Sequence, residues 1–161
     1  MNSKVHKLLS VSSLTILVSL ASSTRADAQN PARALEGTWL VQLTFRNCVD
    51  GTVLRSGFGL NTFLRGGTML GTPSSPVAAV RTGHGVWEHV RGSRFFSRMG
   101  LWAYDTQTGA LLGLRVVSRN IDVGPGSDEF TASDTEQVYD PTTLAPIGAQ
   151  ACITGVGRRV S

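Results

Sequence analysis

Residues 36–46, with the sequence EGTWLVQLTFR, alternate between two sets of side chains without a break. Trp39, Val41, Leu43 and Phe45 share one parity, whereas the other parity is mostly polar. A period of two over this length is typical of a β-strand with one buried face. The segment therefore predicts a strand, and it is the clearest indication of fold in the chain.

The first 28 residues have the three parts of a secretory signal peptide. A charged head at residues 4–7 precedes an apolar run over residues 8–21, and residues 26–28 (Ala-Asp-Ala) supply a small-x-small cleavage site. The apolar run is too short to span a bilayer comfortably. We therefore expect cleavage after residue 28, export to the periplasm or the outside of the cell, and one mature domain of residues 29–161.

The charge of residues 29–161 argues against a nucleic-acid-binding protein. This part of the chain contains 12 arginines, no lysine and 10 acidic residues, so its net charge is only about +2. A nucleic-acid-binding domain normally carries a strongly basic surface or a recognisable motif. No later segment has the length and apolarity of a membrane-spanning helix, and nothing in the sequence indicates an oligomeric state.

Turn signals divide the mature chain into eight segments with a strand-like pattern. The clearest signals are Asp50-Gly51, Gly66-Gly67 and Gly124-Pro125-Gly126. Strands joined by such short turns, without helical periodicity, predict an all-β fold, namely an eight-stranded antiparallel up-and-down barrel that closes around a small lumen. The expected strands are residues 37–47, 53–65, 68–72, 77–90, 94–104, 110–123, 128–139 and 147–159.

The two ends of the chain allow a test of barrel closure. If the first and last strands pair antiparallel, one register brings Trp39 near Arg159 and Cys48 near Cys152, within one bulge or a diagonal pair. Two cysteines in an exported chain predict a disulfide. Such a bond would contribute about 4–5 kcal/mol by restricting the unfolded chain.

The sequence Gly37-Thr38-Trp39 at the start of the first strand, with Arg158 or Arg159 in the last strand, resembles the signature of the lipocalins and the wider calycin superfamily. The resemblance implies an eight-stranded barrel in which the tryptophan packs under an arginine from the last strand. Such a contact is worth roughly 0.5–2 kcal/mol. Barrels of the allene oxide cyclase and dirigent types are similar in size, although no motif selects them.

The segment of residues 84–89 (His-Gly-Val-Trp-Glu-His) contains metal-ligand residue types without the required spacing. On a helix, His84 and Glu88 would converge, but the glycines and apolar neighbours predict a strand, on which they lie about 13 Å apart. His89 faces the opposite way. We therefore expect no metal site and no cofactor, and His84 and Glu88 remain candidates only for an acid or a base.

The predicted strand of residues 128–139 is unusually polar for the wall of a closed barrel. If Phe130 and Val138 face the lumen, Asp134 and Glu136 are inside as well; the opposite parity would line the lumen with neutral polar groups. An inward carboxylate needs a partner, and we slightly favour the alternative that the charged face lies in solvent. The arginines that could pair with an inward carboxylate are Arg94, Arg98, Arg115 and Arg119.

Large apolar side chains of the central strands are candidates for a ligand cage. They are core residues by default and become a binding site only if the lumen is not filled. Glycines 83, 85 and 100 suggest empty space beside them, although the same glycines are also typical of a coiled sheet. The expected ligand-binding residues are Trp87, Phe96, Trp102, Leu114 and Phe130.

Three functions fit this barrel. The leading hypothesis is an exported protein that binds a small, largely apolar molecule in its lumen. The alternative is a cofactor-free cyclase or isomerase in the same lumen, with Asp134, Glu136 or His84 as acid or base and an arginine such as Arg98 stabilising charge. The third is a structural barrel with a packed interior.

Overall fold

The computed structural model describes residues 30–74 and 81–160, and the expected signal peptide lies outside these ranges. A short 3-10 helix, η1 (Pro31–Arg33), precedes eight strands. In these described ranges, no helix is both long and apolar enough to cross a membrane. The strands are β1 (Gly37–Asn47), β2 (Val53–Phe63), β3 (Thr68–Pro73), β4 (Gly83–Arg91), β5 (Arg94–Tyr104), β6 (Leu111–Val123), β7 (Glu129–Tyr139) and β8 (Pro146–Arg159).

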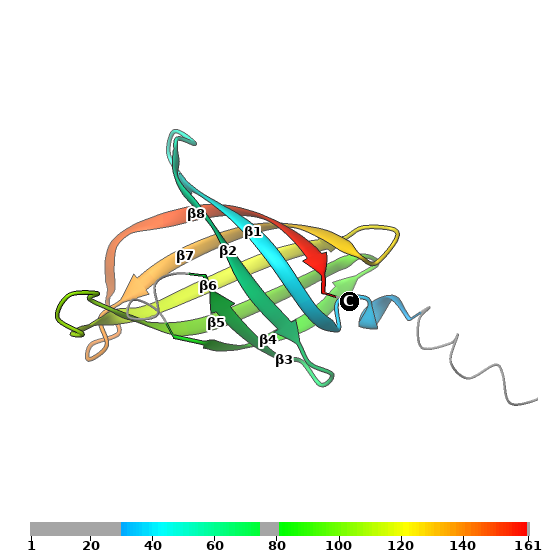
Figure 1. The fold of residues 1–161 in the computed structure, drawn as a ribbon, viewed down its shortest axis with the longest axis horizontal. Helices are drawn as coiled ribbons and strands as arrows, with labels where there is room; N and C mark the ends of the chain where they lie inside the picture. Colours follow the sequence, from blue (N-terminus) through cyan, green and yellow to red (C-terminus); the bar gives the residue numbers. More distant parts are fainter. Residues whose placement is uncertain (1–29, 75–80, 161) are drawn as a thin grey trace, which may run out of the picture.

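The eight strands form one closed barrel in which each strand pairs antiparallel with the next, and β1 also pairs with β8 (Figure 1). The all-β, eight-stranded up-and-down barrel is therefore confirmed. The strand expected over residues 77–90 begins later, at Gly83, and its residues 77–80 lie outside the described ranges.

The register between β1 and β8 is the expected one. Trp39 pairs with Arg159, and the same register continues without a shift to Asn47 and Ala151. Cys48 follows directly, and it forms a disulfide with Cys152, across a Cα–Cα distance of 5.0 Å. The predicted disulfide is thus confirmed as a diagonal contact, and it covalently joins the first and last strands.

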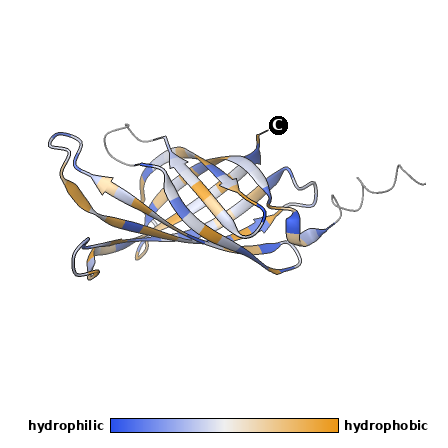
Figure 2. Cartoon of the chain, turned by 90° about the horizontal axis from the view of Figure 1, so that it is seen from below, coloured by the Kyte–Doolittle hydropathy of each residue, from blue (hydrophilic) through white to orange (hydrophobic). Residues whose placement is uncertain are grey.

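Buried residues alternate with more exposed ones along β5 and along the first half of β7, because the strands are pleated. Figure 2 shows hydrophobic and hydrophilic residues interspersed along the strands. On β7, Phe130, Ala132 and Asp134 are buried, so the strand has the parity that places its carboxylates inside. The favoured alternative, with this charged face in solvent, is wrong. The reason is the register with β6, which sets Asp134 directly opposite Arg119.

One end of the barrel is closed by densely packed side chains. The Trp39 and Phe130 rings are 4.9 Å apart, and Phe63 makes edge contacts with both Phe130 and Trp87. The two indole nitrogens donate to backbone carbonyls, Trp39 to Leu35 and Trp87 to Leu64, each at 2.9 Å. Burial of these aromatic side chains is the main source of stability at this end.

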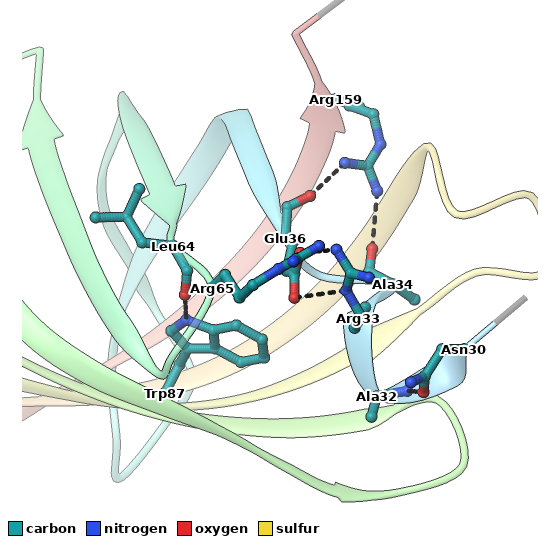
Figure 3. A network of polar contacts seen from close by, with 9 residues as sticks. All are labelled: Asn30, Ala32, Arg33, Ala34, Glu36, Leu64, Arg65, Trp87 and Arg159. Carbon is teal, nitrogen blue, oxygen red and sulfur yellow. Dashed lines mark hydrogen bonds and ion pairs between the residues drawn. The ribbon is translucent and has the colours of Figure 1, made fainter. Parts of the chain in front are cut away.

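Arg159 packs against Trp39 at the closed end and hydrogen-bonds to the backbone around it. Its guanidinium carbon lies 4.3 Å from the centroid of the Trp39 ring, as the calycin resemblance implied. The same group donates to the carbonyls of Glu36 (2.6 Å), Ala34 (2.8 Å) and Ser127 (2.7 Å), and two of these bonds are drawn in Figure 3. It therefore ties together the first strand, the β6–β7 loop and residues 30–36, which precede β1 and which we call the lead-in segment.

Candidate functional site

The opposite half of the lumen contains a cavity of about 60 Å³, which we call the lumen chamber. It is neither apolar throughout nor fully enclosed. Apolar side chains cover part of its wall, and charged or amide side chains cover the rest. The apolar part consists of Leu43, Phe45, Pro73, Met99, Leu101, Val117 and Ile153, and the polar part of Arg55, Asn61, Thr72, Arg115, Arg119 and Glu136.

A buried ion pair forms the floor of the lumen chamber. Arg119 Nε and Nη2 lie 2.8 and 2.7 Å from Asp134 Oδ2, and the two side chains are 5% and 0% exposed. In the amide orientation that satisfies the network, Asn61 accepts a hydrogen bond from Arg119 Nη1 and donates to the Leu60 carbonyl at 3.2 Å. Arg119 is thus held on both sides.

Of the two residues in this pair, Asp134 has the less favourable electrostatic environment. Its Oδ1 is buried without a hydrogen-bond partner. Burial raises the pKa of Asp134 above its ordinary value, because it penalises the charged form, and Arg119 offsets only part of this effect.

A second ion pair, between Arg115 and Glu136, lies nearer the open end of the barrel, which we call the mouth, and its contact distance is longer. Arg115 Nη1 is 3.4 Å from Glu136 Oε1, at the long end of the hydrogen-bonding range. The Nε atom of Arg115 is buried and has no hydrogen-bond partner. A guanidinium has five N–H donors, and the contact with Glu136 involves only Nη1, so Arg115 retains capacity to bind a further acceptor.

Arg55 completes the charged wall at the mouth. Its guanidinium carbon stacks 3.6 Å from the centroid of the Phe45 ring. Burial lowers the pKa of Arg55, and the charge of Arg115 adds to this effect while Glu136 opposes it. Within the described residues Arg55 makes no ion pair of 4.0 Å or less.

The charges around the lumen chamber do not cancel. Arg119 is matched by Asp134, and Arg115 by Glu136, so the guanidinium of Arg55 is in excess. The chamber therefore has a net charge of about +1 when all five groups are ionised. The excess charge attracts anions to the mouth, and because Arg55 is an exposed residue, solvent and salt weaken this attraction relative to that of a buried guanidinium.

The expected ligand-binding residues fall into two groups. Trp87 and Phe130 point inward, but they belong to the packed closed end and do not border the lumen chamber. Phe96, Trp102 and Leu114 lie on the outer wall, where Trp102 is 43% exposed. The opposite face of the β5–β6 hairpin, with Met99 and Val117 among others, is the one that lines the lumen.

The candidate acids and bases separate in the same way. His84, Glu88 and Arg98 are exposed on the outer wall, whereas Asp134 and Glu136 face the lumen. Only Glu136 borders the lumen chamber directly, because Arg119 covers Asp134. The described residues contain no group of three or more His, Cys, Asp or Glu side chains placed to hold a metal ion.

Three polar residues of the lumen chamber, Arg55, Asn61 and Thr72, were not anticipated. Arg55 and Asn61 share the parity of Phe63 on β2, and buried residues of that parity occur from Gly59 to Phe63. The sequence also contained a signal for the ion pair between Arg119 and Asp134. The register between β6 and β7 is symmetric about residues 126 and 127, in the turn, and this symmetry places Arg119 opposite Asp134.

A larger hollow of about 630 Å³ lies on the outer wall across the end of β4 and across β5, β6 and β7. It is broad and open to solvent, and the charged groups on its surface are partly engaged with each other, with Arg94 Nε 3.8 Å from Asp122 Oδ2. It lacks the convergent, partly buried polar groups that typify a small-molecule site. The lumen chamber is therefore the stronger candidate despite its smaller volume.

Comparisons of the sequence with family models and with curated proteins found no match. The closed eight-stranded barrel and the packing of Arg159 on Trp39 are consistent with a calycin-like fold.

Proposed function

We propose that this chain is an exported protein that binds a small molecule in the lumen chamber, with the apolar part of the ligand against Leu43, Met99 and Val117. The observation that carries the proposal is the group of inward-facing charges beside a cavity. Replacing a buried ion pair by apolar residues of similar volume is often neutral or stabilising. A barrel that served only as a packed scaffold would therefore gain nothing from these charges. The disulfide between β1 and β8 fits an oxidising, exported location.

The size of the lumen chamber limits what it can take without rearrangement. Its volume of about 60 Å³ holds a few water molecules, whereas typical ligand sites enclose about 300–1,000 Å³. Met99 is the side chain best able to move aside, because methionine is unbranched and adapts to its surroundings. Each 100 Å² of apolar ligand surface buried here would contribute about 2.5 kcal/mol.

Gly59 offers a direct test, because it borders the lumen chamber and its backbone accepts a side chain. A Cβ at this position would make ordinary contacts, the nearest at 3.4 Å from the Thr72 carbonyl oxygen. Gly59→Val should therefore fill the chamber at little cost to stability. The matched control is Gly126→Val, in the exposed β6–β7 loop, where a Cβ would meet nothing within 4 Å.

The measurement is native mass spectrometry of protein secreted by its own source organism. We expect a bound small molecule in the wild type and in Gly126→Val, and its loss in Gly59→Val. A bound molecule that persists equally in all three proteins would exclude the lumen chamber. The absence of any bound molecule from the wild type would favour the packed structural barrel instead.

A cofactor-free isomerase or cyclase is a second candidate, favoured by the position of Glu136 in the chamber wall beside Arg115. Glu136 would move a proton and Arg115 would stabilise the charge that develops. An isomerase converts its substrate into a product of equal mass and different retention time. If the co-purified molecule undergoes such a change with fresh wild-type protein and not with Glu136→Gln, the protein is an enzyme. If wild-type protein causes no change, it is a binding protein.

A further inference from the structure

We infer that the ligand of the lumen chamber is a monoanion, most simply a carboxylate, whose charged group binds between Arg55 and Arg115. This inference rests on the proposed function of the lumen chamber and names its ligand class. Both arginines border the same cavity, and they approach it from β2 and β6 on different sides of the lumen. The apolar wall formed by Leu43, Met99 and Val117 then faces the rest of the ligand.

The first argument is the charge balance. Two carboxylates pair with Arg115 and Arg119. Arg55 stacks on Phe45 and makes no ion pair of 4.0 Å or less within the described residues, and the charge of Glu136 acts on it only from a greater distance. One added negative charge neutralises the chamber, whereas a dianion would leave a new excess of the opposite sign. A singly charged ligand is therefore the best electrostatic match.

The second argument is the unused hydrogen-bonding capacity of Arg115. Its contact with Glu136 is long at 3.4 Å and involves only Nη1, and the side chain is 27% exposed, so other N–H groups of the guanidinium remain available. A guanidinium binds a carboxylate best through two parallel N–H donors, and Arg115 can present such a pair only to an additional acceptor. Glu136 is then an internal competitor that occupies Arg115 weakly until the ligand arrives.

This competition predicts opposite effects for two neighbouring substitutions. Arg115→Gln should weaken carboxylate binding about 10-fold to 100-fold, since a charge-assisted hydrogen bond is lost. Glu136→Gln should strengthen carboxylate binding several-fold, because the competing charge is removed and the volume is kept. A merely structural role of the pair would not give effects of opposite sign. Arg55→Gln should weaken binding as well.

The test uses three matched pairs of probes, butyrate and butyramide, hexanoate and hexanamide, and benzoate and benzamide, titrated into the mature protein at pH 7. Saturation-transfer NMR and calorimetry give the affinities. The control variant is Arg158→Gln, on the outer wall, where the side chain is 75% exposed and pairs with the exposed Glu129. We expect at least one acid to bind more than 10-fold tighter than its amide, with Arg158→Gln unchanged.

Three other outcomes would overturn the inference, and they are distinguishable from one another. Equal affinity for acids and amides, both lost in Gly59→Val, would leave the lumen as a binding site and refute its preference for anions. Carboxylate binding that survives Arg55→Gln and Arg115→Gln would place the anion elsewhere. If no acid or amide binds to a folded wild-type protein, the proposed function of the chamber fails together with the inference.

Discussion

The buried pair of Arg119 and Asp134 allows the sharpest test of the reasoning about the lumen. Asp134→Ala removes the partner of a guanidinium that is only 5% exposed, so Arg119 retains a charge that solvent cannot reach. Breaking a buried ion pair in this way typically costs about 3–5 kcal/mol. We expect a loss of this size for the single variant, which is a large fraction of the stability of a domain of this length.

The double variant Arg119→Met, Asp134→Leu should behave in the opposite way. It removes both charges and keeps much of the side-chain volume, and such replacements are often neutral or stabilising by about 1–4 kcal/mol. We therefore expect the double variant to be at least as stable as the wild type, although each single substitution destabilises the protein. In the double variant Asn61 loses its hydrogen bond with Arg119, and this loss reduces the expected gain in stability.

The assay is urea unfolding with the disulfide intact, followed by tryptophan fluorescence, since Trp39 and Trp87 are both buried in the folded barrel. Comparison of midpoints at equal slope gives the differences in the free energy of unfolding. A loss below about 1 kcal/mol in Asp134→Ala would mean that water reaches Arg119, and the floor of the chamber would not be dry. A double variant several kcal/mol less stable than the wild type would show that the charges are kept for stability. A ligand would then not be needed to explain why these charges lie in the lumen.

Four further predictions follow from other parts of the barrel. Loss of the disulfide in Cys48→Ser, Cys152→Ser should destabilise the protein by about 4–5 kcal/mol in the same urea assay, and a smaller loss would indicate a strained bond or a structured unfolded state. Arg159→Met should cost about 2–4 kcal/mol by removing its bonds to three carbonyls, whereas Arg158→Met on the outer wall should cost less than about 0.5 kcal/mol. The pKa of Asp134 is raised on folding, so the native state binds more protons than the unfolded state just above pH 3.8. Protonation of this carboxyl therefore favours folding at low pH. Its contribution to the free energy of unfolding declines as the pH rises through the pKa of the folded state. Asp134→Asn should remove that decline from a series of urea midpoints against pH. Leu144→Gly should stabilise the β7–β8 loop by about 0.5–1 kcal/mol, because Leu144 has a φ of 56°, and a lower urea midpoint would contradict this.

The basis of the last prediction is an internal comparison between two loops. Asp105 and Asp140 each accept hydrogen bonds from two backbone nitrogens and from a threonine hydroxyl three residues later. The residue that follows the threonine has positive φ in both loops, and it is Gly109 in the first and Leu144 in the second. Since the two loops make the same bonds, the first loop shows that glycine fits the position of Leu144, and Leu144→Gly measures the cost of a left-handed leucine.

The closure of the barrel could be predicted because independent sequence signals agree there. The parity of β1 is unambiguous, and Trp39, Arg159 and the two cysteines all select one register for β1 and β8. The β5–β6 hairpin lacked such agreement. Phe95 and Phe96 are adjacent on β5, and Val116 and Val117 on β6, so either face could have been the apolar one. Only the closed topology decides which face is inside, and it left Phe96 and Trp102 on the outer wall.

The charged half of the lumen was harder to predict for a physical reason. Sequence patterns identify buried faces through apolar residues, and β7 places Phe130, Ala132 and Val138 on the same face as two carboxylates. An isolated carboxylate inside a barrel is costly, so each one argues for the outward parity when its strand is considered alone. Its partner, Arg119, lies on the neighbouring strand, and the cost disappears only once the register joins them.

The two halves of the lumen therefore have different physical roles. The aromatic end, held by Arg159 and its bonds to the lead-in segment, supplies stability through side chains that do not border the lumen chamber, although they share one continuous core with Met99, Leu101 and Val117. The disulfide holds the β1–β8 seam at the other end, close to the mouth. With both ends secured, the charges between them can be poorly optimised for folding without unfolding the barrel. This division is expected of a binding protein, because a site retains unpaired polar groups only where the rest of the structure compensates for them.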